Sequence, residues 1–227
     1  MLTLSQVRSG DVTVVGPLTK RLLDELSAGK RVLWLVCGGS NIPLSVAVMK
    51  TIPLELREKL TIMLTDERYG KYDHPDSNTR QLREAGFDAS GATVKFVLTP
   101  ENMPLEVTCR QYASALEEAF MLADLVIAQF GIGPDGHIAG MLPHSPAVTS
   151  SELIVGYDAG NFVRITMTPV AFKSIQAAYA FVFGDSKREA LQNLLAGQLT
   201  LDEEPAQILK QLPEAFVYND QVEGEVA

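Results

Sequence analysis

The chain has 227 residues, of which 46% are hydrophobic and 21% are charged. This composition is ordinary for a globular protein and excludes a disordered or low-complexity chain. Asp and Glu outnumber Lys and Arg by 28 to 19, which gives a formal net charge of −9. Such an acidic chain is a poor candidate for binding nucleic acid through a basic surface. If the protein binds an anion, its few cations must gather at one site.

The cysteine content and the lengths of the apolar runs indicate the cellular compartment of the protein. Cys37 and Cys109 are too few for a disulfide framework, and neither lies in a Cys-x-x-Cys pair. The first residues lack a basic segment followed by a long apolar run, and no apolar stretch approaches the ~20 residues of a membrane helix. We therefore expect a cytoplasmic protein that does not enter a membrane. No Pro- or Ser-rich linker divides the sequence, which favours a single domain over residues 1–227.

Short apolar runs alternate with helical patterns along the chain. Buried strands are predicted at residues 32–37, 60–64, 124–130 and 177–183. Helices are predicted at residues 18–28, 43–52, 78–85, 105–122, 187–195 and 205–212. Residues 152–157 and 162–167 predict an antiparallel hairpin, and we expect the end of the acidic tail, residues 219–227, to fray. The order predicts an α/β fold, a three-layer, mostly parallel open sheet of the Rossmann type with a small antiparallel hairpin.

The first candidate site follows the strand at residues 32–37. Gly38, Gly39 and Ser40 stand between this strand and a predicted helix. In an open parallel sheet, ligands bind beyond the carboxyl ends of the strands. Two glycines let the backbone approach a ligand, and the free N–H groups of a helix N-terminus attract an anion. A tight turn with Ser40 or Asn41 as the helix N-cap would explain the same residues.

The second candidate site follows the strand at residues 60–64, where Asp66, Glu67 and Arg68 come in succession. They bring two carboxylates and a guanidinium to the same edge of the sheet, and a guanidinium binds a phosphate or carboxylate through two hydrogen bonds. A solvated charge cluster with internal ion pairs is the alternative for Glu67. Further along, we expect His74 at the surface and Ser77 or Asn78 as an N-cap.

The third candidate site is the loop Gly131-Ile132-Gly133-Pro134-Asp135-Gly136-His137, which follows the strand at residues 124–130. Histidine is the natural general acid or base near neutral pH, and Asp135 is close enough in sequence to orient His137 and stabilise its charged form. The glycines match the dinucleotide pattern G-x-G-x-x-G, but Asp135 would repel a pyrophosphate and no apolar helix follows. A glycine loop with an incidental histidine is the alternative.

The remaining candidate site residues are two further cations and one histidine. Arg164 lies on the second strand of the predicted hairpin, and Lys187 follows the strand at residues 177–183. Either of them, taken alone, is also compatible with a surface charge. We expect His144 to be a loop residue. The histidines and cysteines show no metal-ligand spacing, so the sequence predicts no metal site.

Five motifs, in their order along the chain, resemble those of 6-phosphogluconolactonases, within the glucosamine-6-phosphate isomerase/6-phosphogluconolactonase superfamily. They are Gly-Gly-Ser at 38–40, Asp-Glu-Arg at 66–68 with Asp-His-Pro-Asp-Ser-Asn at 73–78, Gly-Ile-Gly-Pro-Asp-Gly-His at 131–137, Arg-Ile-Thr-Met-Thr at 164–168 and Gly-Asp-Ser-Lys at 184–187. The likeness covers residues 17–220. It implies hydrolysis of 6-phospho-D-glucono-1,5-lactone to 6-phosphogluconate, the second step of the oxidative pentose phosphate pathway, without a cofactor.

The resemblance also implies roles for individual residues. His137 would be the general base that activates water, and Asp66 and Asp135 would support the acid–base network. The residues that would bind the phosphorylated lactone are Arg68 and Lys187, with help from the glycine loop and with Arg164 as a further candidate. The loop contributes Gly38, Gly39 and Ser40.

Several positions depart from the lactonase pattern. Thr65 stands where an aromatic residue is common, and Gly140-Met141-Leu142-Pro143 replaces Ser-Leu-Phe-Pro, so both departures alter the sugar pocket. Ile138-Ala139 resembles the isomerase branch, whose motif reads Asp-Gly-His-Ile-Ala-Phe-Asn-Glu-Pro. Leu142 occupies the position of its glutamate, and leucine cannot shuttle a proton.

Two alternative functions are compatible with the sequence. One is a glucosamine-6-phosphate isomerase or deaminase. The aromatic residue usual in the isomerases after Asp-Glu is Arg68 here, and this difference, like Leu142, favours the lactonase. The other is a non-catalytic regulator that binds a sugar phosphate. Such regulators typically carry an added DNA-binding domain, for which we expect no room before Pro17.

Overall fold

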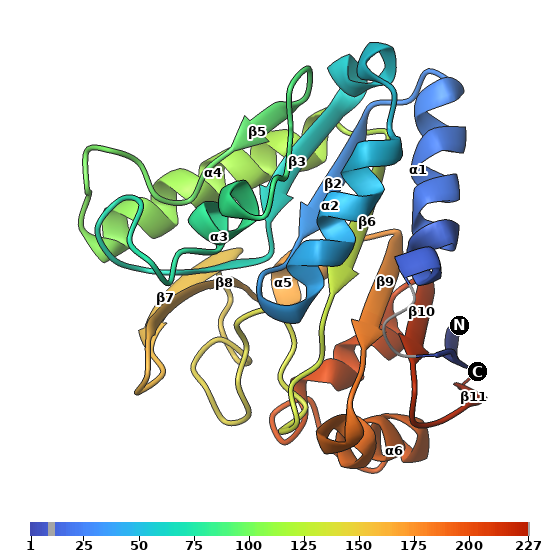
Figure 1. Cartoon of the computed structure of the whole chain (residues 1–227). Coiled ribbons are helices and arrows are strands. Elements are labelled where there is room, and N and C mark those ends of the chain that lie inside the picture. Colours follow the sequence, from blue (N-terminus) through green and yellow to red (C-terminus); the bar gives the residue numbers. More distant parts are fainter. Residues whose placement is uncertain (9–11, 227) are drawn as a thin grey trace.

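The computed structural model describes residues 1–8 and 12–226. One open sheet has the strand order β11-β1-β10-β9-β6-β2-β3-β5, and Figure 1 shows it from one face. All neighbouring strands pair in parallel except β11, which is antiparallel to β1. The strands are β1 Leu2–Gln6, β2 Val32–Val36, β3 Leu60–Leu64, β5 Thr93–Lys95, β6 Leu125–Phe130, β9 Ala177–Val182, β10 Glu214–Asn219 and β11 Gly224–Val226.

The central strands are the most apolar segments of the chain. Every residue of β2, β6 and β9 is buried, because helices cover both faces of a parallel sheet. Trp34 in β2 is completely buried, and Phe130 at the end of β6 stacks on Phe172 with 5.1 Å between the ring centroids. All four strands predicted from apolar runs are confirmed.

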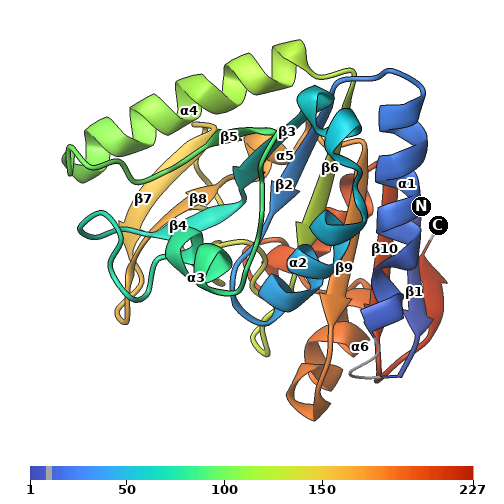
Figure 2. The same cartoon turned by 45° about the horizontal axis from the view of Figure 1, so that its top comes forward.

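Helices form a layer on each face of the sheet. Helices α1 (Gly16–Ser27) and α2 (Ile42–Thr51) cover one face, and α4 (Leu105–Leu122) lies across the opposite face, as comparison of Figures 1 and 2 shows. The hydroxyl group of Tyr112 in α4 accepts a hydrogen bond from the Leu64 N–H at 2.7 Å and donates one to the Leu64 carbonyl at 2.8 Å. The α/β fold with three layers is therefore confirmed.

Shorter helices occupy the connections. They are α3 (Asn78–Glu84), α5 (Pro169–Phe172) and α6 (Arg188–Ala196), with 3₁₀ helices at Val12–Val15, Gly39–Asn41, Leu54–Lys59, Asp185–Lys187 and Pro205–Gln211. The helix predicted at residues 205–212 thus forms, but as a 3₁₀ helix.

A second, antiparallel sheet contains β7 (Ile154–Asp158), β8 (Val163–Met167) and β4 (Asp66–Arg68), in the order β4-β8-β7. The predicted hairpin is confirmed as β7 and β8. The sequence did not predict the third strand, which is the Asp-Glu-Arg motif itself. Its pairing with β8 puts Arg68 directly opposite Arg164.

The two ends of the chain lie close together at one edge of the large sheet (Figure 1). There β11 pairs with β1, so the tail is ordered into a strand as far as Val226, where we expected it to fray. Residue 227 lies outside the described residues. No helix in the described ranges is long and apolar enough to cross a membrane.

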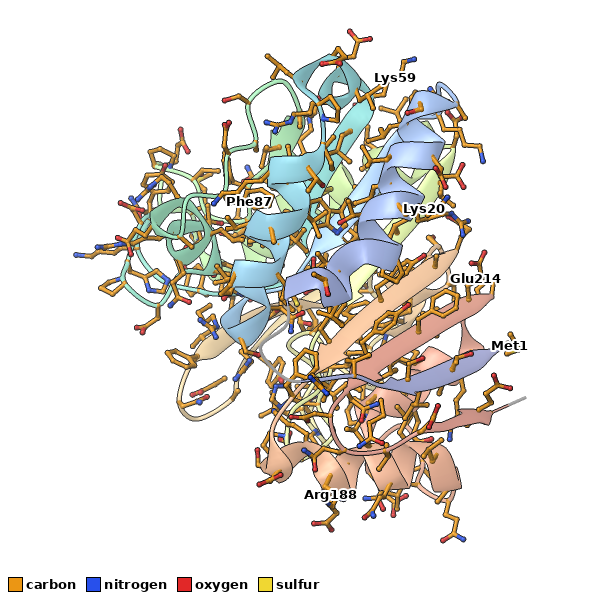
Figure 3. All side chains as sticks on the ribbon, turned by 45° about the vertical axis from the view of Figure 1, so that its right-hand side comes forward. Met1, Lys20, Lys59, Phe87, Arg188 and Glu214 are labelled. Atoms are coloured by element: carbon orange, nitrogen blue, oxygen red, sulfur yellow. The ribbon has the colours of Figure 1, made fainter. Side chains whose placement is uncertain are left out.

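The topology marks one position at which a ligand site is expected. The chain passes from β2 to β3 and β5 on one side, then returns to β6 on the other side of β2. In open α/β sheets, ligands bind at the carboxyl ends of the strands beside such a reversal. Figure 3 indicates the two ends of the molecule, with Lys59 just before β3 at the amino ends of the strands and Arg188 beyond the carboxyl end of β9.

Candidate active site

A cavity of about 180 Å³ opens at the carboxyl ends of β2, β3, β6 and β9. Eight of the nine residues that the sequence predicts for the site line it, namely Gly38, Gly39, Ser40, Asp66, Arg68, His137, Arg164 and Lys187. The ninth, Asp135, lies outside this lining and reaches the site through His137. The three candidate loops and the hairpin therefore meet at the reversal in strand order.

His137 and Asp135 form a hydrogen-bonded pair at the mouth of the loop after β6. His137 Nδ1 lies 2.6 Å from Asp135 Oδ1, and the backbone N–H of His137 donates to the same oxygen at 3.2 Å. The hydrogen bond from His137 lowers the pKa of Asp135 to about 2, so this carboxylate stays ionised at neutral pH. A carboxylate accepts the Nδ1 proton, which leaves Nε2 of the neutral ring able to take a proton from a substrate or water.

The glycines of this loop permit that contact. The Gly133 N–H donates to the His137 carbonyl at 2.9 Å, and the Gly136 N–H donates to the Gly133 carbonyl at 3.0 Å, so the loop folds back on itself. A Cβ at Gly133 would lie 2.0 Å from His137 Nδ1 and 2.4 Å from Asp135 Oδ1. Any larger residue at position 133 would therefore push the His137 imidazole away from the Asp135 carboxylate.

Two arginines face each other on the other side of the cavity. Arg68 on β4 and Arg164 on β8 are direct partners in the register, although like charges at such positions repel. Their Cζ atoms lie 5.3 and 6.0 Å from the centroid of the Phe162 ring, which attracts both cations. The Nε atoms of both arginines are buried and have no hydrogen-bond partner among the described residues. An anion bound between them would remove the repulsion.

Lys187 adds a third positive charge from the end of β9. Burial lowers the pKa of Lys187, and the charge of Asp135 opposes this effect. Among the described residues, no carboxylate comes within 4 Å of a charged nitrogen of Arg68, Arg164 or Lys187. In a chain with an excess of acidic residues, three such cations on one cavity indicate an anion site.

The two carboxylates of the Asp-Glu-Arg motif have different surroundings. Asp66 lines the cavity, and its Oδ1 accepts a hydrogen bond from Thr65 Oγ1 at 3.1 Å. Glu67 is completely buried and accepts five hydrogen bonds, from Arg68 N, Ser77 Oγ, Asn78 N and both N and Oγ1 of Thr79. Glu67 therefore ties β4 to the start of α3, and its interpretation as a solvated charge cluster is wrong.

The glycine loop after β2 rests on a buried amide network that the sequence did not predict. Asn41 holds the N-cap position of α2, but its Nδ2 donates to the Phe181 carbonyl at 3.1 Å and does not cap the helix. Gln129 Nε2 donates to Asn41 Oδ1 at 3.3 Å, and Ser45 Oγ donates to Gln129 Oε1 at 3.1 Å. These contacts join α2 to β6 and β9 beneath the cavity. A polar Gln129 within an otherwise apolar strand is the one signal of them in the sequence.

The remaining polar residues have structural contacts. Ser77 caps α3 by accepting a hydrogen bond from Arg80 N at 3.2 Å, as predicted. Asn78 lines the cavity and donates from Nδ2 to the Asp66 carbonyl at 2.9 Å, a position that its N-cap prediction did not anticipate. His74 Nε2 lies 2.8 Å from the Arg68 carbonyl. His144 pairs with Asp202 at 2.7 Å on the surface.

This fold and this cavity define an α/β protein with three cations and a histidine–carboxylate pair at the carboxyl ends of its parallel strands. Comparison with known proteins shows the family to which it belongs. The family model described as glucosamine-6-phosphate isomerases/6-phosphogluconolactonase matches residues 13–218. The chain therefore belongs to this family, as the order of its motifs predicts.

Individual relatives cover most of the chain. It is 30% identical to a 6-phosphogluconolactonase of Synechocystis sp., over 94% of this chain and 90% of that protein. Its fold is similar to that of a 6-phosphogluconolactonase from Thermotoga maritima, with a TM-score of 0.82, 21% identity and coverage of 96% and 99%. A monomeric glucosamine-6-phosphate deaminase is also similar in fold, with a TM-score of 0.76, 19% identity and coverage of 96% and 97%.

Proposed function

We propose that this protein acts as a 6-phosphogluconolactonase, a hydrolase that converts 6-phospho-D-glucono-1,5-lactone and water to 6-phosphogluconate. The observation that carries the proposal is the pairing of Asp135 with His137 at 2.6 Å beside a cavity lined by three cations that form no ion pair with any described residue. A base and an anion site within one small cavity suit a phosphorylated substrate whose carbonyl carbon is attacked by water. The 30% identity to a protein named 6-phosphogluconolactonase supports the same substrate.

In the proposed reaction, Nε2 of neutral His137 takes a proton from water while the water oxygen bonds to C1 of the lactone. Asp135 holds the Nδ1 proton and stabilises the imidazolium that forms. The tetrahedral intermediate then collapses, the bond from C1 to the ring oxygen breaks, and His137 returns its proton to the departing oxygen. Arg68, Arg164 and Lys187 bind the phosphate away from the reacting carbon, and such remote binding can lower the barrier of the chemical step.

The main rival is a glucosamine-6-phosphate deaminase. The fold does not separate the two activities, because a deaminase and a lactonase are both structural neighbours. One residue difference favours the lactonase, since Leu142 occupies the position at which the isomerase motif has a glutamate. Leucine cannot shuttle a proton, so it cannot replace the glutamate that partners the histidine in the isomerase motif.

The direct test compares substrates with purified protein. Freshly prepared 6-phosphogluconolactone should be hydrolysed faster than its measured spontaneous opening, and glucosamine 6-phosphate should release no ammonia above a control without enzyme. Ammonia release would assign the deaminase activity. Tight binding of the sugar phosphate without turnover of either compound would support the non-catalytic regulator. The cytoplasmic location, the single domain and the lack of a nucleic-acid partner stay predictions.

A further inference from the structure

One buried carboxyl group contacts the His137 loop and takes no part in the proposed reaction. Glu204 precedes the 3₁₀ helix Pro205–Gln211, and 1% of its surface is exposed. Its Oε2 accepts a hydrogen bond from Gln207 Nε2, whereas its Oε1 is buried and has no hydrogen-bond partner among the described residues. Burying an unsatisfied carboxyl oxygen is costly, so its presence requires a reason beyond packing.

The unsatisfied oxygen faces the turn between Asp135 and His137. A Cβ at Gly136 would lie 2.3 Å from Glu204 Cγ and 2.9 Å from Glu204 Oε1, so the glutamate side chain packs directly on the glycine backbone. Gly136 has φ +77°, which larger residues rarely adopt. The next helix reinforces the contact, because the Ala206 N–H donates to the Gly136 carbonyl at 2.9 Å.

Other charged groups surround this carboxyl. Asp135 and Glu204 line one cavity of about 290 Å³ together with Glu189 from α6 and the exposed Glu203. Two cations act on this cluster. Lys210 attracts Glu204, and its Nζ donates to Gln207 Oε1 at 2.6 Å, whereas Lys187 interacts with Asp135. Burial raises the pKa of Glu204 to about 7, with Gln207 and Lys210 opposing that rise. Its charge therefore changes near neutral pH.

We propose that Glu204 is a positioning residue for His137, supporting the Asp135–Gly136–His137 turn from below and coupling its own charge to the proton affinity of the imidazole. The role in catalysis rests on His137 being the base of the proposed function. Ionised Glu204 places a second negative charge behind Asp135. That charge favours the imidazolium, so it raises the proton affinity of His137.

The test uses Glu204→Gln, which keeps the shape of the side chain and cannot ionise. Glu203→Gln is the matched control, because it removes a neighbouring carboxylate that is exposed and bonded to Thr200. NMR titration of the three histidines, with His137 assigned by its loss in His137→Asn, reports on the imidazole without any substrate. We expect His137 to titrate at a pH lower by on the order of half a unit in Glu204→Gln, and at the wild-type pH in Glu203→Gln.

Kinetics then test the consequence for catalysis. The acid limb of the pH–rate profile should move to lower pH in Glu204→Gln, and Glu204→Ala, which removes the support, should lower kcat roughly 10- to 100-fold with little change in KM. A folded Glu204→Gln protein whose His137 titrates as in the wild type would overturn the proposal, whatever Glu204→Ala does. Because the NMR result needs no turnover, it stays decisive even if the lactonase assay is negative.

Discussion

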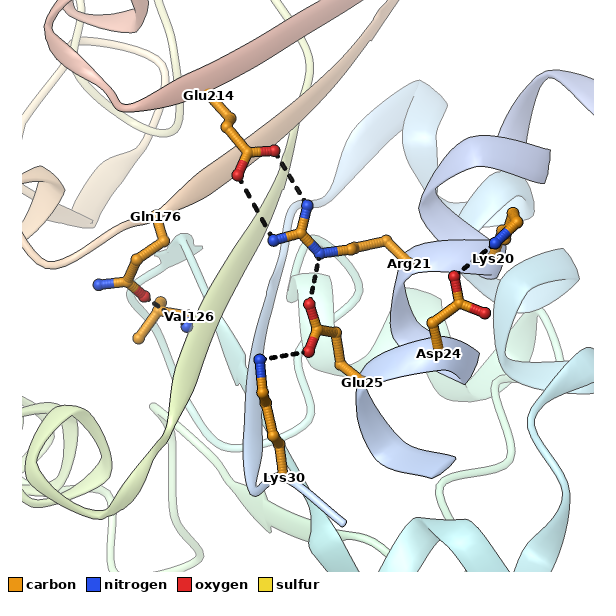
Figure 4. A network of polar contacts seen from close by, with 8 residues as sticks. All are labelled: Lys20, Arg21, Asp24, Glu25, Lys30, Val126, Gln176 and Glu214. Atoms are coloured by element: carbon orange, nitrogen blue, oxygen red, sulfur yellow. Dashed lines mark hydrogen bonds and ion pairs between the residues drawn. The ribbon is translucent and has the colours of Figure 1, made fainter. Parts of the chain in front are cut away.

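The cations at the two ends of the large sheet differ in their ion pairing. At the amino ends of the strands, Arg21 donates to Glu25 at 2.8 Å and to Glu214 at 2.9 Å, and Lys30 contacts Glu25 at 2.6 Å, as Figure 4 shows. Arg31 pairs with Asp124 at 2.8 Å at the same end. At the carboxyl ends, Arg68, Arg164 and Lys187 share one cavity and form no ion pair in the described ranges.

This difference does not arise from a shortage of carboxylates, since the chain carries 28 acidic residues. Like-charged Arg68 and Arg164 are instead placed opposite each other by the pairing of β4 with β8. Such an arrangement lowers stability unless a ligand supplies the missing charge. We therefore infer that the cations at the amino ends of the strands stabilise the fold, and we propose that those at the carboxyl ends bind an anion. The following changes test that division, from the largest expected effect to the smallest.

His137→Asn should cause the largest loss, because it removes the titrating group and keeps approximate volume. We expect kcat on the phosphorylated lactone to fall roughly 10²- to 10⁴-fold. His144→Asn is the matched control, since His144 pairs with Asp202 at the surface. Rates are corrected for spontaneous opening, and circular dichroism checks the fold. Near wild-type turnover in folded His137→Asn would remove this residue from the mechanism.

Gly133→Ala should separate His137 from Asp135 without deleting either one. The added methyl group would lie 2.0 Å from His137 Nδ1, so the imidazole must move. A misplacement of about 1 Å at a catalytic group can cost about 10²-fold in rate, so we expect a loss of kcat of that order. Gly16→Ala adds the same methyl group where no atom lies within 4 Å, and it should leave kcat unchanged. Equal activity of the two variants would show that the close contact at Gly133 does not matter.

Glu204→Gln should change how stability depends on pH. The pKa of Glu204 is about 7 in the folded protein and 4.5 ordinarily, so the folded state retains a proton that the unfolded state has released between these values. The stabilisation is complete below pH 4.5 and is lost as the pH rises through 7. Between pH 5 and pH 8, the wild type should lose roughly 2–3 kcal/mol of unfolding free energy relative to Glu204→Gln. Urea unfolding at the two pH values measures this difference, and parallel curves would contradict it.

Lys20→Ala should have the smallest effect. Lys20 pairs with Asp24 on the surface of α1, with 76% and 58% of the two side chains exposed. Pairs of this kind contribute at most about 1 kcal/mol, so thermal unfolding and lactonase activity should both stay close to those of the wild type. A large loss of activity would mean that charge removal anywhere on this protein impairs catalysis, and the contrast between the two ends would fail.

The central strands and the position of the candidate site are predictable from the sequence because burial restricts which residues a central strand can contain. Strands buried on both faces are mainly apolar, so β2, β3, β6 and β9 are visible as apolar runs, with Thr61 in β3 and Gln129 in β6 as the polar exceptions. The loops that follow such strands in a parallel sheet meet at one edge, where Gly39, Asp66 and His137 line the same cavity. This clustering can be predicted even when the register of the strands is unknown.

Features that depend on long-range pairing were not predictable. The polar segment Asp66–Arg68 becomes a strand because β8 offers it hydrogen-bonding partners, and the opposition of Arg68 and Arg164 follows from that register. Strands β11, β1 and β10 form one side of the sheet. β1 and β11 lack a continuous apolar run, and the run in β10 is limited to Ala215–Tyr218. Glutamate is mostly found at protein surfaces, so the sequence gives no sign that Glu204 is buried. Its burial against Gly136 is evident from the three-dimensional structure alone.

We propose above that the cations at the carboxyl ends of the strands bind the phosphate of the substrate. The most direct measurement is kcat/KM of Lys187→Ala on 6-phosphogluconolactone and on unphosphorylated gluconolactone, with Lys20→Ala as the matched charge control. A lost charge-assisted contact is worth about 1.5–3 kcal/mol, so we expect a loss of roughly 10- to 100-fold on the phosphorylated lactone and little loss on the other. Equal losses on the two lactones would contradict the account.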